Sequence, residues 1–134
     1  MRTSVLLFLI VGGCAAATHY FVTLGVDFAT GIDPAWSNLI GFLCAFPVSY
    51  TGHRRWSFAG TRASHRQALP RLFAVSCTAF AGNQIMLAAL LRLTPLPLWI
   101  ALGIVLVFVA MSTFVLGRYW AFAHRTIRWA KAGG

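Results

Sequence analysis

The sequence contains no glutamate and only two acidic residues, both aspartates, among 134 residues. Charged residues make up 10% of the chain, whereas soluble domains carry about 25%. So little charge cannot cover a water-facing surface, which excludes an ordinary soluble domain and indicates an integral membrane protein. The shortage of carboxylates also removes the usual acid–base groups, so we expect a protein that is not an enzyme and needs no cofactor.

Cysteine contributes no recognisable site. The three cysteines, Cys14, Cys44 and Cys77, all lie inside apolar stretches and lack the short spacings of metal ligands. A buried free cysteine behaves as a small hydrophobic residue. We therefore assign these cysteines no chemistry, and we expect no metal site.

Long charge-free stretches are abundant. They cover residues 3–26, 34–53, 72–91 and 93–117, and a helix of about 20 residues crosses the hydrocarbon core of a bilayer. Pro95 and Pro97 shorten the last stretch, so its helix is expected to begin near Leu98. The pattern predicts an all-α integral membrane protein with four transmembrane helices.

The basic residues are distributed unevenly between the connections. Ten of the eleven lie at the N-terminus, in residues 54–71 or in the C-terminal segment from residue 118, and residues 27–33 contain none. Positive charge near membrane helices stays in the cytoplasm. This asymmetry predicts that both termini and the middle loop are cytoplasmic. The net charge of +9 is then explained by basic residues that set the topology and contact anionic lipid. We expect no nucleic-acid partner.

A short signature occurs twice, 64 positions apart: Arg-Arg-Trp-Ser-Phe-Ala at residues 54–59 and Arg-Tyr-Trp-Ala-Phe-Ala at residues 118–123. A shift of 64 positions superposes the first two apolar stretches on the last two. The sequence predicts one domain, residues 1–134, with parallel helix-hairpin repeats at about residues 4–59 and 68–123 and a cytoplasmic tail at 124–134. A cleaved signal peptide in the first 17 residues is the alternative, but cleavage would delete one helix of the repeat.

The same shift pairs polar residues inside the apolar stretches. His19 falls on Asn83, and Ser49 falls on Thr113. Such groups are costly in lipid, and they either join helices through hydrogen bonds or line a functional path. We predict an intramembrane polar path that consists of His19, Ser49, Asn83, Gln84 and Thr113, with simple helix packing as the alternative.

Three features together resemble the GtrA-like family over about residues 6–125. They are the four apolar stretches, the Val-Gly-Gly run at residues 11–13 and the Arg-x-Trp-x-Phe signature at two helix ends. The chain departs from the family where His53 and Ser49 replace common asparagines. His19 also stands where members often carry an acidic residue.

The resemblance implies a function. Such proteins are proposed to flip polyprenyl-phosphate-linked sugars from the cytoplasmic to the outer leaflet of the bacterial inner membrane, for cell-surface polysaccharide synthesis. The expected partners are this lipid-linked sugar, the lipid bilayer, a second copy of the chain and a membrane glycosyltransferase. Two alternatives remain: an accessory subunit of a polyprenyl-phosphate glycosyltransferase, and a small multidrug exporter, which would need an acidic residue in the first helix.

The repeated signature supplies candidate ligands for such a lipid. Guanidinium groups bind phosphate oxygens as a fork, so we predict that Arg54, Arg55 and Arg118 bind the lipid phosphate. The expected contacts to the sugar head group or the first isoprene units are Trp56, Phe58, Trp120 and Phe122. The alternative is that these arginines only anchor the topology and that the aromatic residues form an interfacial belt.

Overall fold

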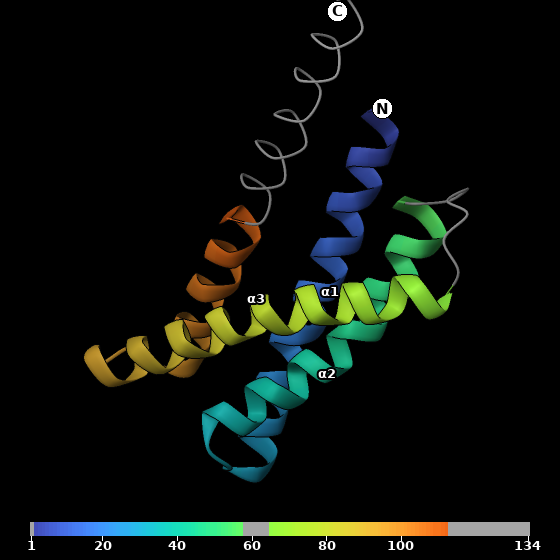
Figure 1. Cartoon of the computed structure of the whole chain (residues 1–134). Coiled ribbons are helices and arrows are strands. Elements are labelled where there is room, and N and C mark those ends of the chain that lie inside the picture. Colours follow the sequence, from blue (N-terminus) through green and yellow to red (C-terminus); the bar gives the residue numbers. More distant parts are fainter. Residues whose placement is uncertain (1, 58–64, 113–134) are drawn as a thin grey trace, which may run out of the picture.

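The computed structural model describes residues 2–57 and 65–112, and the regular structure in these two ranges is helical. Its elements are α1 (Arg2–Thr30), α2 (Pro34–Gly52), the π-helical turn η1 (His53–Ser57), α3 (His65–Leu93) and a further helix, Leu98–Ser112. α1 and α2 form an antiparallel hairpin, and α3 crosses this hairpin (Figure 1). The Leu98–Ser112 helix packs against both α1 and α3.

The hairpin connection is short because its residues end one helix and begin the next. Gly31 adopts a left-handed φ of 63°, which glycine tolerates best. Its N–H donates to the carbonyl of Asp27 at 2.8 Å and closes α1. The Asp33 carboxylate accepts from the Ala35 N–H at 2.8 Å, and Pro34 occupies the first helical position of α2.

The outside of the bundle is apolar. Phe28, Leu93 and Ile85 are 94%, 82% and 73% exposed, while several of the most buried side chains are polar. This arrangement suits lipid rather than water. α1 and α3 contain the segments Leu6–Thr30 and Leu72–Leu93, which are long and apolar enough to cross a membrane.

Two helices extend beyond the charge-free stretches. α1 continues through Asp27, and α3 begins at His65 and includes Arg66 and Arg71. Helical hydrogen bonding does not stop at the membrane surface, so charge marks the edge of the bilayer rather than the end of a helix. The last helix begins at Leu98, as its prolines predict.

The three cysteines differ in exposure. Cys14 and Cys44 are exposed on the surface of the helices, and Cys77 is half-buried. An apolar outer face accepts a small, weakly polar thiol as readily as a core does. None of the three forms a disulfide.

Small residues on α2 allow close contact with α1. A Cβ atom added to Gly41 would lie 2.8 Å from the His19 carbonyl oxygen and would also collide with the Thr23 hydroxyl. A Cβ on Gly52 would lie 2.6 Å from a methyl group of Val11. Small residues are what bring helix backbones together in lipid, where the hydrophobic effect does not drive association. α1 and α2 therefore depend on these glycines for their contact.

A shift of 64 positions relates buried residues of the α1–α2 hairpin to buried residues of α3 and the last helix. The interior of the α1–α2 hairpin includes the buried residues Thr23, Ser37, Asn38 and Gly41. A shift of 64 positions leads from these four to Leu87, Ala101, Leu102 and Val105, which form the buried apolar cluster between α3 and the Leu98–Ser112 helix. One hairpin thus has a polar interior where the other has an apolar one.

We expect Gly41→Ala to destabilise the protein by about 1–3 kcal/mol, because the added methyl group overpacks the α1–α2 contact. Gly13→Ala is the matched control, since a Cβ at Gly13 meets no neighbouring atom within 4 Å. A glycine-to-alanine change at such an open helical site is neutral or stabilising, by about 0.5–1 kcal/mol. Thermal unfolding in detergent would measure both variants, and equal effects would contradict this account of Gly41.

Candidate functional site

Asn38 lies at the centre of a polar cluster that joins three helices. Its side-chain oxygen is 2.8 Å from Nε2 of His19 on α1. Its side-chain nitrogen donates to Oδ1 of Asn83 at 2.8 Å and to Oε1 of Gln84 at 2.5 Å, both on α3. Asn38, Asn83 and His19 are all buried. A single amide on α2 therefore connects to both neighbouring helices.

The directions of these hydrogen bonds follow from one backbone carbonyl. Gln84 Nε2 donates to the carbonyl of Ala35 at 2.9 Å, and a carbonyl can only accept. The Gln84 oxygen must therefore face Asn38, whose nitrogen donates to it. The Asn38 oxygen then faces His19, so His19 Nε2 carries the proton and donates. In the neutral ring, Nδ1 remains an acceptor.

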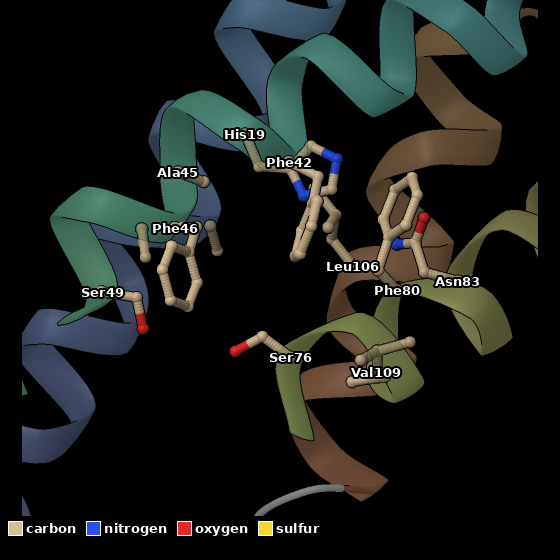
Figure 2. A pocket seen from close by; sticks show the side chains of 13 residues that line it. His19, Phe42, Ala45, Phe46, Ser49, Ser76, Phe80, Asn83, Leu106 and Val109 are labelled. Carbon is tan, nitrogen blue, oxygen red and sulfur yellow. The ribbon is translucent and has the colours of Figure 1, made fainter. Parts of the chain in front are cut away.

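A cavity of about 180 Å³ adjoins this cluster and is lined by all four helices. His19 and Asn83 contribute the polar part of one side, and the side chains of Ser49 and Ser76 extend into the open space from α2 and α3 (Figure 2). Most of the remaining lining is apolar and comes from phenylalanine, alanine, leucine and valine. The cavity is smaller than pockets for drug-sized ligands, which measure about 300–1,000 Å³.

Aromatic rings form one wall of the cavity and continue beyond it. The rings of Phe42 and Phe80 stack with centroids 4.4 Å apart, and Phe46 meets Phe73 edge to face at 5.1 Å. Phe46 also stacks with Tyr50 at 6.3 Å. The four-residue spacing of Phe42, Phe46 and Tyr50 places them on one face of α2. This row of rings leads from the polar cluster toward η1.

The basic turn lies at the opposite end of α2 from Asn38. Arg54, Arg55 and Trp56 belong to η1, and Trp56 is 54% exposed. His53 precedes them and contacts Phe8 of α1, with the two rings tilted by 30° and their centroids 4.6 Å apart. A π-helical turn changes the direction of the side chains that follow it, and such turns are frequent at functional sites. The first copy of the signature is therefore attached to α1 through His53.

Some of the predicted site residues lie close together in the structure, and others lie outside the described residues. His19, Asn83 and Gln84 share the polar cluster, while His19, Asn83 and Ser49 line the cavity. Phe58, Thr113, Arg118, Trp120 and Phe122 lie outside the described residues. Within the described ranges, no group of three or more His, Cys, Asp or Glu side chains is placed to hold a metal ion.

The sequence pattern does not single out Asn38, the centre of the cluster. Its amide is polar in a charge-free stretch, as the amide of Asn83 is, and that was the available signal. The repeat concealed it, because a shift of 64 positions pairs Asn38 with the apolar Leu102. Thr23 and Ser37 are also fully buried, and their hydroxyls have no hydrogen-bond partner among the described residues.

We expect Asn38→Leu to destabilise the protein by about 1–3 kcal/mol, because it leaves buried donors and acceptors on α1 and α3 without partners. Asn38→Leu and Asn83→Leu should be non-additive in a double-mutant cycle, since both remove the same hydrogen bond. Ser49→Ala is the control, because no hydrogen bond in the described part of the chain joins Ser49 to this cluster. Additive effects of the two asparagine changes, measured by unfolding in detergent, would contradict the network.

Comparison with known proteins identifies the family. A family model described as GtrA/DPMS, transmembrane domain, matches residues 7–122. Searches of curated proteins and of solved structures gave no significant match. The match covers most of the chain and agrees with the resemblance drawn from the repeated signature and the apolar stretches. This protein is therefore a membrane protein that belongs to the GtrA/DPMS transmembrane-domain family, a family with a role in polysaccharide and glycolipid synthesis.

Proposed function

We propose that this protein flips a polyprenyl-phosphate-linked sugar from the cytoplasmic to the outer leaflet of the bacterial inner membrane. The observation that carries the proposal is the polar cluster of His19, Asn38 and Asn83 beside a cavity shared by four helices. A protein that only anchors a partner has no need to keep such costly groups in lipid. Hydroxyl-rich sugars need donors and acceptors of this kind.

Polar groups recur along α2 and into η1. Arg54 follows Asn38 by 16 residues, which corresponds to about 24 Å of helix. The hydrocarbon core is about 30 Å thick. Ser49 and Ser76 line the cavity between these two levels. A head group that leaves the basic turn would thus meet hydroxyl and amide groups on its way across.

The basic turn is the proposed entry point. Arg54 and Arg55 offer two guanidinium groups on one turn, and a phosphate that carries negative charge binds such groups strongly. The chain has only two carboxylates, Asp27 and Asp33, and both lie near the opposite end of the hairpin. No acidic side chain in η1 therefore competes with the lipid for these arginines. Arg118 of the second signature is proposed to act in the same way.

The small cavity means that transport requires rearrangement or a second copy. At about 180 Å³, it accommodates only part of a sugar phosphate at any one time. We propose that a homo-oligomer, or movement of α3 relative to the α1–α2 hairpin, enlarges it. The lipid undergoes no covalent change in this scheme, so the protein acts as a transporter and not as an enzyme.

The proposed direction of transport requires η1 to be cytoplasmic. In a variant whose three cysteines are replaced by alanine, Thr30→Cys should react with a membrane-impermeant maleimide on intact cells. Ser57→Cys should react only after the cells are permeabilised, because the positive-inside rule places η1 and its arginines in the cytoplasm. The reverse labelling pattern would contradict the orientation.

In liposomes, the purified protein should accelerate the movement of a fluorescent polyprenyl-phosphate sugar between leaflets. Arg54→Lys should lower lipid binding by roughly tenfold to a hundredfold, because a fork of charge-assisted hydrogen bonds is lost although the charge remains. Fluorescence quenching from the outer leaflet measures transport, and titration with the lipid measures binding.

Arg62→Ala provides the control, since it removes a positive charge from the same loop but lies outside the signature. Equal damage from Arg62→Ala and Arg54→Lys would show that the arginines act through topology alone. If the wild-type protein does not accelerate transport, but a glycosyltransferase co-purifies with it and loses activity without it, the accessory role replaces transport.

A further inference from the structure

An apolar groove lies between α1 and α2 at the end of the hairpin that carries η1. It has a volume of about 220 Å³. Leu7, Ile10 and Cys14 line it from α1, Val48 lines it from α2, and Trp56 lines it from η1. The α1 residues span two turns, or about 10 Å of helix. The groove is separate from the cavity beside the polar cluster, because the two share no lining residue.

The floor of the groove is formed by a close helix contact. Gly52 and Val11 are both buried, and a Cβ on Gly52 would lie 2.6 Å from a Val11 methyl group. The walls are open instead: Ile10 is 52% exposed, and Cys14 is exposed. The groove is therefore a shallow, lipid-facing channel with a fixed base. A flexible hydrocarbon chain can enter it from the side.

The groove ends next to a positive charge. Trp56 is one of its lining residues, and Arg54 and Arg55 immediately precede Trp56 on η1. The charge and the apolar lining therefore match an amphiphile with an anionic head and a hydrocarbon tail. The aspartate nearest to this turn in the sequence is Asp33, 20 residues before His53, so nothing acidic in the local sequence opposes an anion.

A second apolar groove, on a helix without charged residues, serves as a comparison. It is larger, about 610 Å³, and is lined by Tyr20, Trp99, Gly103, Phe108 and Met111, among others. The Leu98–Ser112 helix, which supplies most of its lining, has no charged residue. Any lipid chain can lie in such a groove. Of these two grooves, as the described residues line them, the groove beside η1 is the one whose lining includes a residue next to arginines in the sequence.

We propose that the groove beside η1 binds the first isoprene units of the polyprenyl phosphate while Arg54 and Arg55 hold its phosphate. This inference rests on the proposed function, because it identifies where the tail of the transported lipid lies. Burial of the tail in the groove would hold the phosphate at the basic turn. The head group would then be free to reach the cavity between the helices.

Photocrosslinking tests the groove directly. The probe is farnesyl phosphate with a diazirine on its first isoprene unit, added to the full-length protein in detergent–lipid micelles. We expect crosslinks in residues 7–14 and 48–56 that unlabelled undecaprenyl phosphate competes away. Cys14→Phe fills the groove and should reduce this labelling by roughly tenfold, as expected when apolar contact to one or two methylene-sized groups is lost. Val48→Phe fills it from α2 and should have the same effect.

Matched controls separate specific binding from general contact with lipid. Gly13→Phe adds the same side chain next to Cys14 at an open position and should leave labelling unchanged. Farnesol with the same diazirine has the same tail but no phosphate, and it should not label residues 7–14 in preference to residues 103–111. Equal labelling of both grooves by the farnesyl probe, or normal labelling of both filled variants, would overturn the proposal.

The outcome also distinguishes the groove from the proposed function. If the wild-type protein transports lipid but the probe does not label the groove, the tail binds elsewhere and the transport proposal stands. If the probe labels the groove and Cys14→Phe prevents it, but the wild-type protein transports nothing, the groove is a lipid-binding site of a protein with another role. Each result therefore identifies which of the two ideas fails.

Discussion

The arrangement of the helices depends on the hydrogen bonds of one amide. Asn38 donates to Asn83 and Gln84 on α3 and accepts from His19 on α1, within a bundle whose outside is apolar. In lipid, the hydrophobic effect does not hold helices together, so packing and interhelical hydrogen bonds must do so. A buried amide without partners is costly, and its partners here lie on two other helices. The position of α3 across the hairpin is therefore linked to this amide.

The interiors of the two helix pairs differ in chemistry at positions that are 64 residues apart. Leu87 and Leu102 pack in an apolar cluster between α3 and the last helix. The corresponding positions of the first hairpin hold Thr23 and Asn38. An apolar interior stabilises without directional bonds, whereas the polar interior presents donors and acceptors beside the cavity.

The polar cluster and the basic turn lie at opposite ends of α2, and the aromatic row of Phe42, Phe46 and Tyr50 lies between them. This arrangement suits a lipid whose phosphate, sugar and tail have different requirements. A guanidinium favours the phosphate, amides and hydroxyls favour the sugar, and an apolar groove favours the tail. Membership in a family of polysaccharide and glycolipid synthesis fits a ligand of this kind.

The amino-acid sequence alone predicts the membrane class, the family, the start of the last helix at Leu98 and the importance of the polar residues His19, Asn83 and Gln84 inside apolar stretches. These follow from local composition, from proline chemistry and from a repeat that can be read along the chain. Only the tertiary structure selected Asn38 as the centre of the cluster and Gly41 as the point of closest helix contact. Hydrogen-bond partners and close contacts depend on how helices cross, and residues 19, 45 and 46 positions apart meet only after they do. The repeat did not reveal Asn38, because the 64-residue shift pairs this polar residue with the apolar Leu102.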